Sequence, residues 1–331
     1  MKPCRTLHQV VDSSDRRTFL GALSGTLASL CLVEADARAM ESQSRVPRIR
    51  EANNRPPLVK IYHSTWALRG LPRGAKEWSF EEKLTHVKDA GFVGIETEDV
   101  LENDSVELIR KLGLDFGMGS SKILRSVQEV RQGLEICKRA GAKYYVIVAG
   151  DAFMSDDSAA ALVKDSIQAS ADLGVPLLFE THRRSLTESC YRVLSLIDRV
   201  PDIRFCADLS HFVVSGSLGG ASSQEWIQRW GPIVDRSDSF QCRISNGEQV
   251  QVDVGDGSSK LAQKWVELWA EILRRWVKRA QPGDFFPVTS ELGPPNYSIV
   301  DPSGVEISDR WQQSLVMKQL TEQAWALARK I

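Results

Sequence analysis

The chain has 331 residues, with 42 Lys and Arg against 43 Asp and Glu, so its formal net charge is −1. With 42% hydrophobic and 26% charged residues, the composition excludes a disordered or a collagen-like chain. A charge this close to zero lacks the basic excess of nucleic-acid-binding proteins, and we expect no nucleic acid partner. Only five His are present, which argues against a multi-zinc site built mainly on His.

The first 39 residues have the pattern of an export signal. Arg16 and Arg17 precede a mild apolar run over residues 19–33, which is too short for a stable membrane helix. Two A-x-A cleavage patterns follow, at residues 35–37 and 37–39. The segment resembles a twin-arginine signal peptide, and a chance arginine pair before a buried helix is the alternative. The resemblance implies a periplasmic or otherwise extracytoplasmic protein, without membrane association after cleavage.

Residues 40–57 are polar and contain three prolines, which predicts a linker. Beyond it, the hydrophobic pattern predicts strands at residues 58–63, 92–97, 114–119, 143–149, 175–180, 203–209, 239–245 and 285–292. Helices are predicted at residues 79–90, 105–112, 126–140, 157–173, 186–199, 224–234, 260–279 and 308–329, several of them ending at glycine.

Eight strand–helix units are the number in a (β/α)8 barrel, also called a TIM barrel, and predict a single domain over residues 58–331. An open doubly wound sheet is the alternative. It would require a glycine-rich phosphate-binding turn after the first strand, and the sequence from His63 to Trp66 has none.

Polar side chains gather at the ends of predicted strands five to eight, where the active site of such a barrel lies. Glu180 and His182 share one side of their strand, as do Gln241 and Arg243 of theirs. Asp208 and Glu291 end the two other strands. Three carboxylates brought together would repel one another unless a cation lay among them, which predicts a divalent metal ion. The alternative for each acid alone is a helix cap or a surface ion pair.

The sequences around these residues resemble the xylose isomerase-like TIM barrels, also called the sugar phosphate isomerase/epimerase family. The matching segments run from Phe179 to Arg183, Cys206 to His211, Cys242 to Ser245 and Ser290 to Pro295, and the resemblance extends over residues 58–329. It implies one divalent ion held by Glu180, Asp208, Gln241 and Glu291. Gln241 stands where the family usually has His, and an all-oxygen ligand set favours manganese or magnesium over zinc or cobalt.

The resemblance also implies that the metal anchors a hydroxyl–carbonyl pair of a sugar while a side chain moves a proton on the carbon beside the carbonyl. Glu180, Glu291 and His182 are the candidates for this proton transfer. His211 could bind substrate or hold Asp208. Arg183 and Arg243 could bind a carboxylate or a phosphate, and Arg243 could instead neutralise the carboxylates. The candidates for substrate binding are His63, Trp66, Glu96, Arg183, His211 and Arg243.

Three functions remain open at this point. The first is a metal-dependent sugar isomerase or epimerase, or a related lyase, acting on a small carbohydrate. The second is a sugar-binding or accessory protein with reduced catalysis, which Gln241 favours. The third, an endonuclease on the same barrel, fits poorly with the small number of His and the near-neutral charge. Some of the nine Trp could line a homo-oligomer interface, and the sequence does not identify the sugar.

Overall fold

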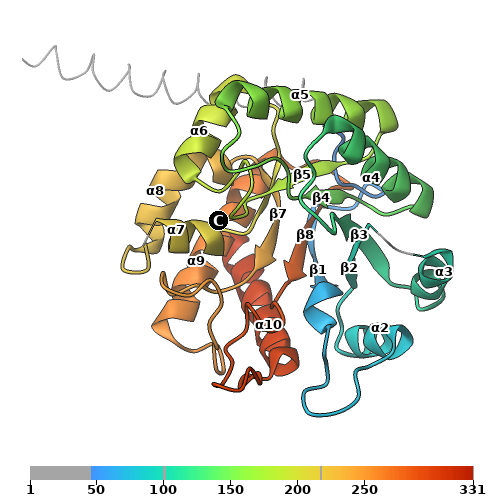
Figure 1. Ribbon diagram of the computed structural model, residues 1–331, viewed down its shortest axis with the longest axis vertical. Coiled ribbons are helices and arrows are strands. Elements are labelled where there is room, and N and C mark those ends of the chain that lie inside the picture. Colours follow the sequence, from blue (N-terminus) through green and yellow to red (C-terminus); the bar gives the residue numbers. More distant parts are fainter. Residues whose placement is uncertain (1–45, 100–101, 217, 331) are drawn as a thin grey trace, which may run out of the picture. The chain divides into compact units, whose positions relative to one another are not determined.

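Eight parallel strands pair in chain order and close into a barrel, in which β8 pairs with β1 (Figure 1). The computed structural model describes residues 46–99, 102–216 and 218–330, so the expected signal peptide lies outside the described residues. The strands are β1 (Leu58–Ser64), β2 (Gly94–Glu98), β3 (Asp115–Gly119), β4 (Tyr145–Ile147), β5 (Leu177–Glu180), β6 (Phe205–Ala207), β7 (Ser237–Cys242) and β8 (Phe285–Ser290). This architecture confirms the predicted (β/α)8 barrel and excludes the open sheet.

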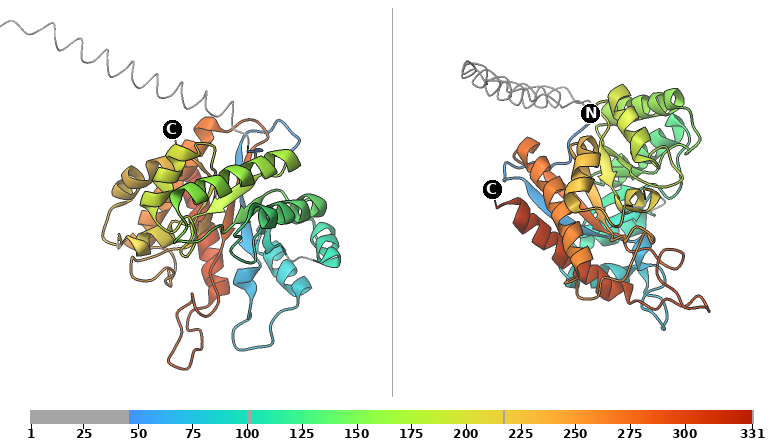
Figure 2. Two further views of the ribbon diagram at one scale, coloured as in Figure 1. Left: turned by 45° about the horizontal axis from the view of Figure 1, so that its top comes forward. Right: turned by 90° about the vertical axis from the view of Figure 1, so that its left-hand side faces the viewer.

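Helices connect successive strands and form the outer layer (Figures 1 and 2). They are α2 (Phe80–Asp89), α3 (Asn103–Lys111), α4 (Val127–Ala140), α5 (Asp156–Leu173), α6 (Cys190–Arg199), α7 (Ser210–Ser215), α8 (Ser223–Val234), α9 (Lys260–Arg279) and α10 (Arg310–Ala328), with a 3-10 turn, η1 (Trp66–Leu68), after β1. Serine side chains accept hydrogen bonds from the first turns of α2, α4, α5, α8 and α9, which fixes where these helices begin.

Two local differences from the predicted elements lie at the carboxyl ends of strands. The short helix α7 follows β6 directly, because the Asp208 side chain accepts hydrogen bonds from Ser210 and turns the chain there. Helix α6 begins at Cys190 rather than at residue 186. Its predicted first turn is replaced by a loop in which Thr187 donates to the Glu180 carbonyl and Ser185 to the His182 carbonyl.

Two layers of apolar side chains hold the barrel together. The barrel interior is filled by a small cluster that includes Tyr62, Tyr144 and Leu178, whereas the larger cluster lies between strands and helices. Four tryptophans of α8 and α9 are buried in that outer layer and pack on one another, namely Trp226, Trp230, Trp265 and Trp269. None of the described helices is long and apolar enough to cross a bilayer.

The described part of the expected linker lies against the barrel. Val46 and Ile49 are buried, and Arg50 forms an antiparallel bridge with Asp284 at the start of β8. Arg48 makes an ion pair of 2.5 Å with the same buried aspartate. This segment therefore covers the amino-terminal ends of β1 and β8, at the opposite end of the strands from the polar residues singled out above.

Candidate active site

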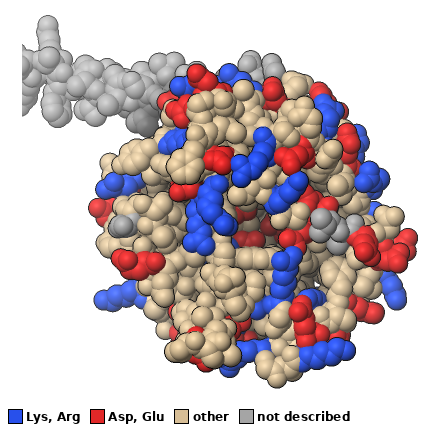
Figure 3. Space-filling view, in the orientation of Figure 1, with Lys and Arg blue, Asp and Glu red and all other residues tan. Residues whose placement is uncertain are grey.

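A cavity of about 270 Å³ opens at the carboxyl ends of the strands, where a TIM barrel places its active site. Its lining includes Glu96, Glu180, Gln241, Arg243 and Glu291, which come from four different strands or the loops directly after them. In the space-filling view, Lys and Arg side chains border a central hollow in which Asp and Glu are visible (Figure 3). The polar strand ends expected from the sequence thus meet in one place.

Three carboxylates form the centre of the site. One oxygen each from Glu180, Asp208 and Glu291 lies within 4.8 Å of the others. Asp208 is fully buried, and its Oδ1 accepts hydrogen bonds from the Ser210 amide and hydroxyl at 3.1 and 2.5 Å. Its Oδ2 is buried and accepts no hydrogen bond. The turn after β6 therefore holds one carboxylate oxygen available for a cation.

Arg243 is the cation that the structure places beside these carboxylates. Its Nη2 lies 2.5 Å from Glu291 Oε2 and 3.4 Å from Asp208 Oδ2. The guanidinium is almost completely buried, so its charge is screened little by solvent. Arg243 thus partly neutralises the three carboxylates, which is one of the two roles expected for it.

One guanidinium does not compensate all the buried acids. Burial raises the pKa of Glu291 to about 8, against the lowering effect of Arg243. Burial, together with the charges of Glu291 and Asp208, raises the pKa of Glu180 well above its usual range. Burial also raises the pKa of Glu96, although Thr289 and Gln241 donate hydrogen bonds to it. The site therefore binds protons at neutral pH that a divalent cation would displace.

Gln241 takes part in the site through its amide nitrogen. Nε2 lies 3.3 Å from Glu180 Oε2 and 3.5 Å from Glu96 Oε1, so it links the acid on β5 to the acid on β2. Its Oε1 is buried and has no hydrogen-bond partner. In this orientation the side chain holds Glu180 and does not present its oxygen to the three carboxylates.

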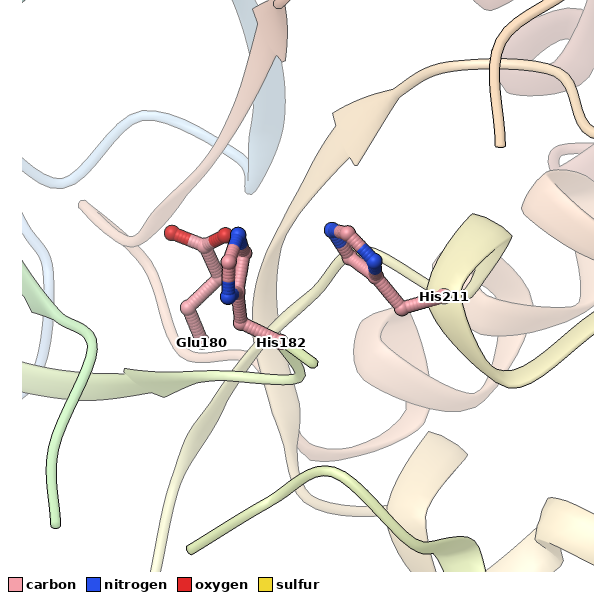
Figure 4. Close-up of side chains that lie close together, drawn as sticks. All are labelled: Glu180, His182 and His211. Carbon is pink, nitrogen blue, oxygen red and sulfur yellow. The ribbon is translucent and has the colours of Figure 1, made fainter. Parts of the chain in front are cut away.

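Two histidines, His182 and His211, lie close to Glu180. Figure 4 shows His182 beside Glu180 at the end of β5, and His211 facing them from α7. The His182 and His211 ring centroids are 4.3 Å apart, and His211 Nε2 lies 3.5 Å from Asp208 Oδ2. Burial and the neighbouring ring lower the pKa of His182 to about 3, and burial with the nearby arginines lowers that of His211 well below its usual range. Both rings are therefore neutral at physiological pH.

Not every expected substrate contact lies in this cavity. His63 is buried outside the strand layer, where its ring packs on Phe92 and Trp311, so it does not line the cavity. The alternation of side chains explains this, because Ser64 rather than His63 lines the cavity. Trp66 and Glu96 line the cavity as expected, whereas Arg183 lies at its mouth.

Sequence reasoning missed Tyr297, which connects several of these residues. Its hydroxyl lies 3.2 Å from His182 Nε2, and its ring centroid lies 5.2 Å from that of Trp66 and 4.8 Å from the Arg243 guanidinium carbon. Only glycine fits at residue 293, because a Cβ there would lie 2.5 Å from the Trp66 ring and 2.6 Å from Tyr297 Cβ. An aromatic residue in the loop after an acid-bearing strand is the pattern that could have indicated Tyr297.

The donor set fits a divalent ion. Three clustered carboxylates, one of them with a buried oxygen that accepts no hydrogen bond, are ligands of the kind that manganese and magnesium prefer. Glu180, His182 and His211 form a second group whose ligand atoms also lie within 4.8 Å of one another. Glu180 belongs to both groups, so a cation in either position would contact it.

These acids make the free energy of unfolding of the metal-free protein depend on pH in a distinctive way. Between pH 6.5 and 8, folded Glu291 retains a proton that the unfolded chain has already released, so the free energy of unfolding should fall as pH rises, by up to about 1.4 kcal/mol per pH unit. Below pH 6.5 the histidines act in the opposite sense, because their folded pKa is depressed. Urea unfolding of chelator-treated protein across this range measures the slope.

Two matched variants test whether the pH slope comes from the buried acids of the site or from exposed acids elsewhere. Glu291→Gln should reduce the slope between pH 6.5 and 8, whereas Glu107→Gln, at an exposed position on α3, should leave it unchanged. A free energy of unfolding that rises through this window in the unmodified protein would contradict the argument.

Comparison with solved structures supports the fold. The probable 3-DHS dehydratase AsbF of Bacillus anthracis aligns over 80% of this chain and 99% of its own, with a TM-score of 0.52 and 17% identity. The 3-keto-D-glucoside 4-epimerase YcjR from E. coli aligns over 80% and 99%, with a TM-score of 0.51 and 14% identity. A xylose isomerase-like TIM barrel protein from Mycobacterium smegmatis, in complex with magnesium, aligns over 80% and 98%, with a TM-score of 0.50 and 12% identity.

No curated protein matches the sequence significantly. The family model described as "Xylose isomerase-like TIM barrel" matches residues 84–251, about half of the chain, including Glu180, Asp208 and Gln241. The chain therefore belongs to the xylose isomerase-like TIM barrel family.

Proposed function

We propose that the protein is a metal-dependent enzyme that transfers a proton at the carbon beside the carbonyl of a sugar or keto-sugar. The observation that carries this proposal is the group of three carboxylates within 4.8 Å at the carboxyl end of the barrel, one of which has a buried oxygen that accepts no hydrogen bond. Solved structures with this fold include a sugar epimerase and a dehydratase, which supports an activity on carbohydrates without specifying it.

Glu180, Asp208 and Glu291 would hold one divalent ion, with manganese or magnesium favoured by their oxygen donors. Such an ion polarises a bound carbonyl and makes the adjacent carbon more acidic. Gln241 would keep Glu180 in place through its amide nitrogen, or become a fourth ligand if its amide turned over.

The protein's own groups supply the proton transfer. Glu180 or Glu291 accepts the proton from the carbon, and the electron pair of the broken C–H bond moves to the carbonyl oxygen. The Arg243 guanidinium stabilises the negative charge that develops there. Return of the proton to the opposite face gives an epimer, return to the neighbouring carbon gives an isomer, and departure of a hydroxyl as water gives an eliminated product.

His182 is suited to move a hydroxyl proton. Its Nδ1 lies 2.5 Å from the Arg183 carbonyl, which places the ring hydrogen on Nδ1 and leaves a lone pair on Nε2. That Nε2 lies 3.2 Å from the Tyr297 hydroxyl, which provides a path for the proton toward the mouth of the cavity.

The first test is the metal content of the protein. We expect about one equivalent of manganese or a similar ion by elemental mass spectrometry after incubation and desalting. Glu291→Gln should weaken metal binding by about tenfold or more, because it removes one charged ligand and leaves Arg243 to oppose the cation. Glu107→Gln, on the exposed face of α3, should bind metal as the unmodified protein does.

Failure to bind manganese, magnesium, cobalt or zinc at millimolar concentration would overturn the metalloenzyme proposal. The favoured function would then be that of a sugar-binding or accessory protein on the same barrel, to which the amide at residue 241 already points.

The side chain at residue 241 decides between these two functions. We expect Gln241→His to tighten manganese or zinc binding by about tenfold, because imidazole is a stronger ligand than a neutral amide. Solvent deuterium incorporation into keto-sugars, followed by NMR, measures catalysis. Exchange by the unmodified protein supports an enzyme, whereas exchange only by Gln241→His would indicate a binding protein that has lost the reaction.

We also propose that the protein is exported by the twin-arginine route, on the basis of Arg16, Arg17 and the apolar run that follows. Replacement of both arginines by lysine should retain the protein in the cytoplasm with residues 1–39 still attached. Cell fractionation with mass measurement of the amino terminus tests this. Export of the double variant with normal cleavage would contradict the assignment.

A further inference from the structure

A second, broader cavity of about 750 Å³ lies at the mouth of the first. Its lining includes three arginines, Arg69, Arg183 and Arg184, together with Trp66, Asn296 and Tyr297. Trp66, Arg184 and Tyr297 line both cavities, so the two are continuous. A ligand with one end among the carboxylates can therefore extend its other end toward these arginines.

Two of the three arginines have no acidic partner among the described residues. Arg69 forms an ion pair with Glu98. Within the ranges that the structure describes, neither Arg183 nor Arg184 has a carboxylate oxygen within 4.0 Å of its guanidinium, and the Arg183 guanidinium carbon lies 4.8 Å from the centre of the Tyr297 ring. An aromatic face orients a guanidinium and leaves its N–H groups free to bind an anion. The mouth thus presents two uncompensated positive charges.

The backbone around this cavity is strained. Among the described residues, Arg184 and Asn296 are the two non-glycine positions with positive φ, 66° and 94°, and both line this cavity. Asparagine tolerates such angles, but for a residue as large as arginine they are unfavourable. Strain of this kind persists where the surrounding structure enforces it, and it gathers at functional sites.

The loop after β5 holds Arg184 in that conformation. The Glu188 carboxylate accepts a hydrogen bond of 2.6 Å from the Arg184 amide. Ser185 and Thr187 pin the same loop to the carbonyls of His182 and Glu180 at 2.7 and 2.6 Å. The hydrogen bonds that fix the backbone at Glu180 and His182 thus also hold the backbone of Arg184 at the mouth.

We propose that Arg183 and Arg184 form a subsite for an anionic group, so that the substrate is a carbohydrate with a carboxylate or a phosphate remote from its reacting carbon. The inner cavity is rich in acids and the mouth is rich in unpaired arginines, which matches a ligand with a polar reacting end and a negative far end. A neutral sugar would leave both guanidiniums without a charged partner. This subsite rests on the proposed function for the position of the reacting end.

Tyr297 joins the two parts of the site. Its ring centroid lies 4.8 Å from the guanidinium carbon of Arg183 and 4.8 Å from that of Arg243, which itself contacts Glu291. The width of one aromatic side chain therefore separates the anion subsite from the group of carboxylates, a span that a single pentose or hexose derivative can bridge.

Binding of matched ligands to the full protein tests the subsite. The probes for isothermal titration calorimetry are glucose, glucuronate, glucose 6-phosphate and inorganic phosphate, at low and at high ionic strength. We expect at least one charged sugar to bind about tenfold or more tightly than glucose, with a preference that shrinks at high salt. The glucuronate and glucose 6-phosphate titrations show whether the subsite prefers a carboxylate or a phosphate.

Three variants give the proposal its controls. Arg183→Gln and Arg139→Gln remove one charge each, at the mouth and at an exposed position on α4, and only the first should weaken binding of the charged probe, by about tenfold. Arg184→Gly should weaken anion binding while it leaves the melting temperature unchanged or raises it, because glycine relieves the positive φ. Loss of affinity with retained stability separates anion recognition from a structural role.

Equal affinity for glucose and both charged sugars, absence of binding by every charged probe, or unchanged binding in both mouth variants would overturn the subsite. Metal content of the same samples keeps this result apart from the proposed function. Bound metal without a preference for charged sugars would overturn the subsite alone, whereas a charge preference in a protein that binds no metal would overturn the metalloenzyme and leave the subsite in place.

Discussion

The burial of several acids at one end of the barrel is the constraint on which the site depends. Glu96, Glu180, Asp208 and Glu291 converge there, and Arg243 is in direct contact with two of them. Removing so many carboxylates from water is unfavourable unless protons, hydrogen bonds or a cation compensate their charge. The raised pKa values of Glu180 and Glu291 and the bridging amide of Gln241 are the ways in which this chain achieves that compensation.

Hydrogen bonds to the end of β5 give the loop that follows this strand its shape. This loop carries His182 toward the carboxylates, and Ser185 and Thr187 replace the expected first turn of a helix by bonding to the carbonyls of the strand end. Helix α6 therefore begins late, and residues 186–189 belong instead to the loop that brings His182, Arg183 and Arg184 to the cavity and its mouth. Arg184 follows in this loop with a backbone conformation that arginine seldom adopts.

The periodicity of the sequence was sufficient to predict the barrel, because eight strand–helix units with capped helices leave few other arrangements. Position at the ends of strands also predicted the convergence of Glu180, Asp208 and Glu291. Periodicity could not determine on which side of β1 the His63 side chain lies. A one-residue difference in phase decides whether a side chain faces the barrel axis or the helices. Tyr297 and Arg184 lie in irregular loops, where tertiary hydrogen bonds rather than local pattern determine which way a side chain points.

The segment that precedes β1 has a consequence for how the molecule is made. Arg48 pairs with Asp284, 236 residues further along the chain, and Arg50 bridges the same residue where β8 begins. The first and last strands meet along this seam, so the ribosome must deliver nearly the whole barrel before the circle of strands can close. A nascent chain that stops before β8 exposes the edge of β1 and lacks Asp284 as the ion-pair partner of Arg48, so the barrel can close only after β8 has been made.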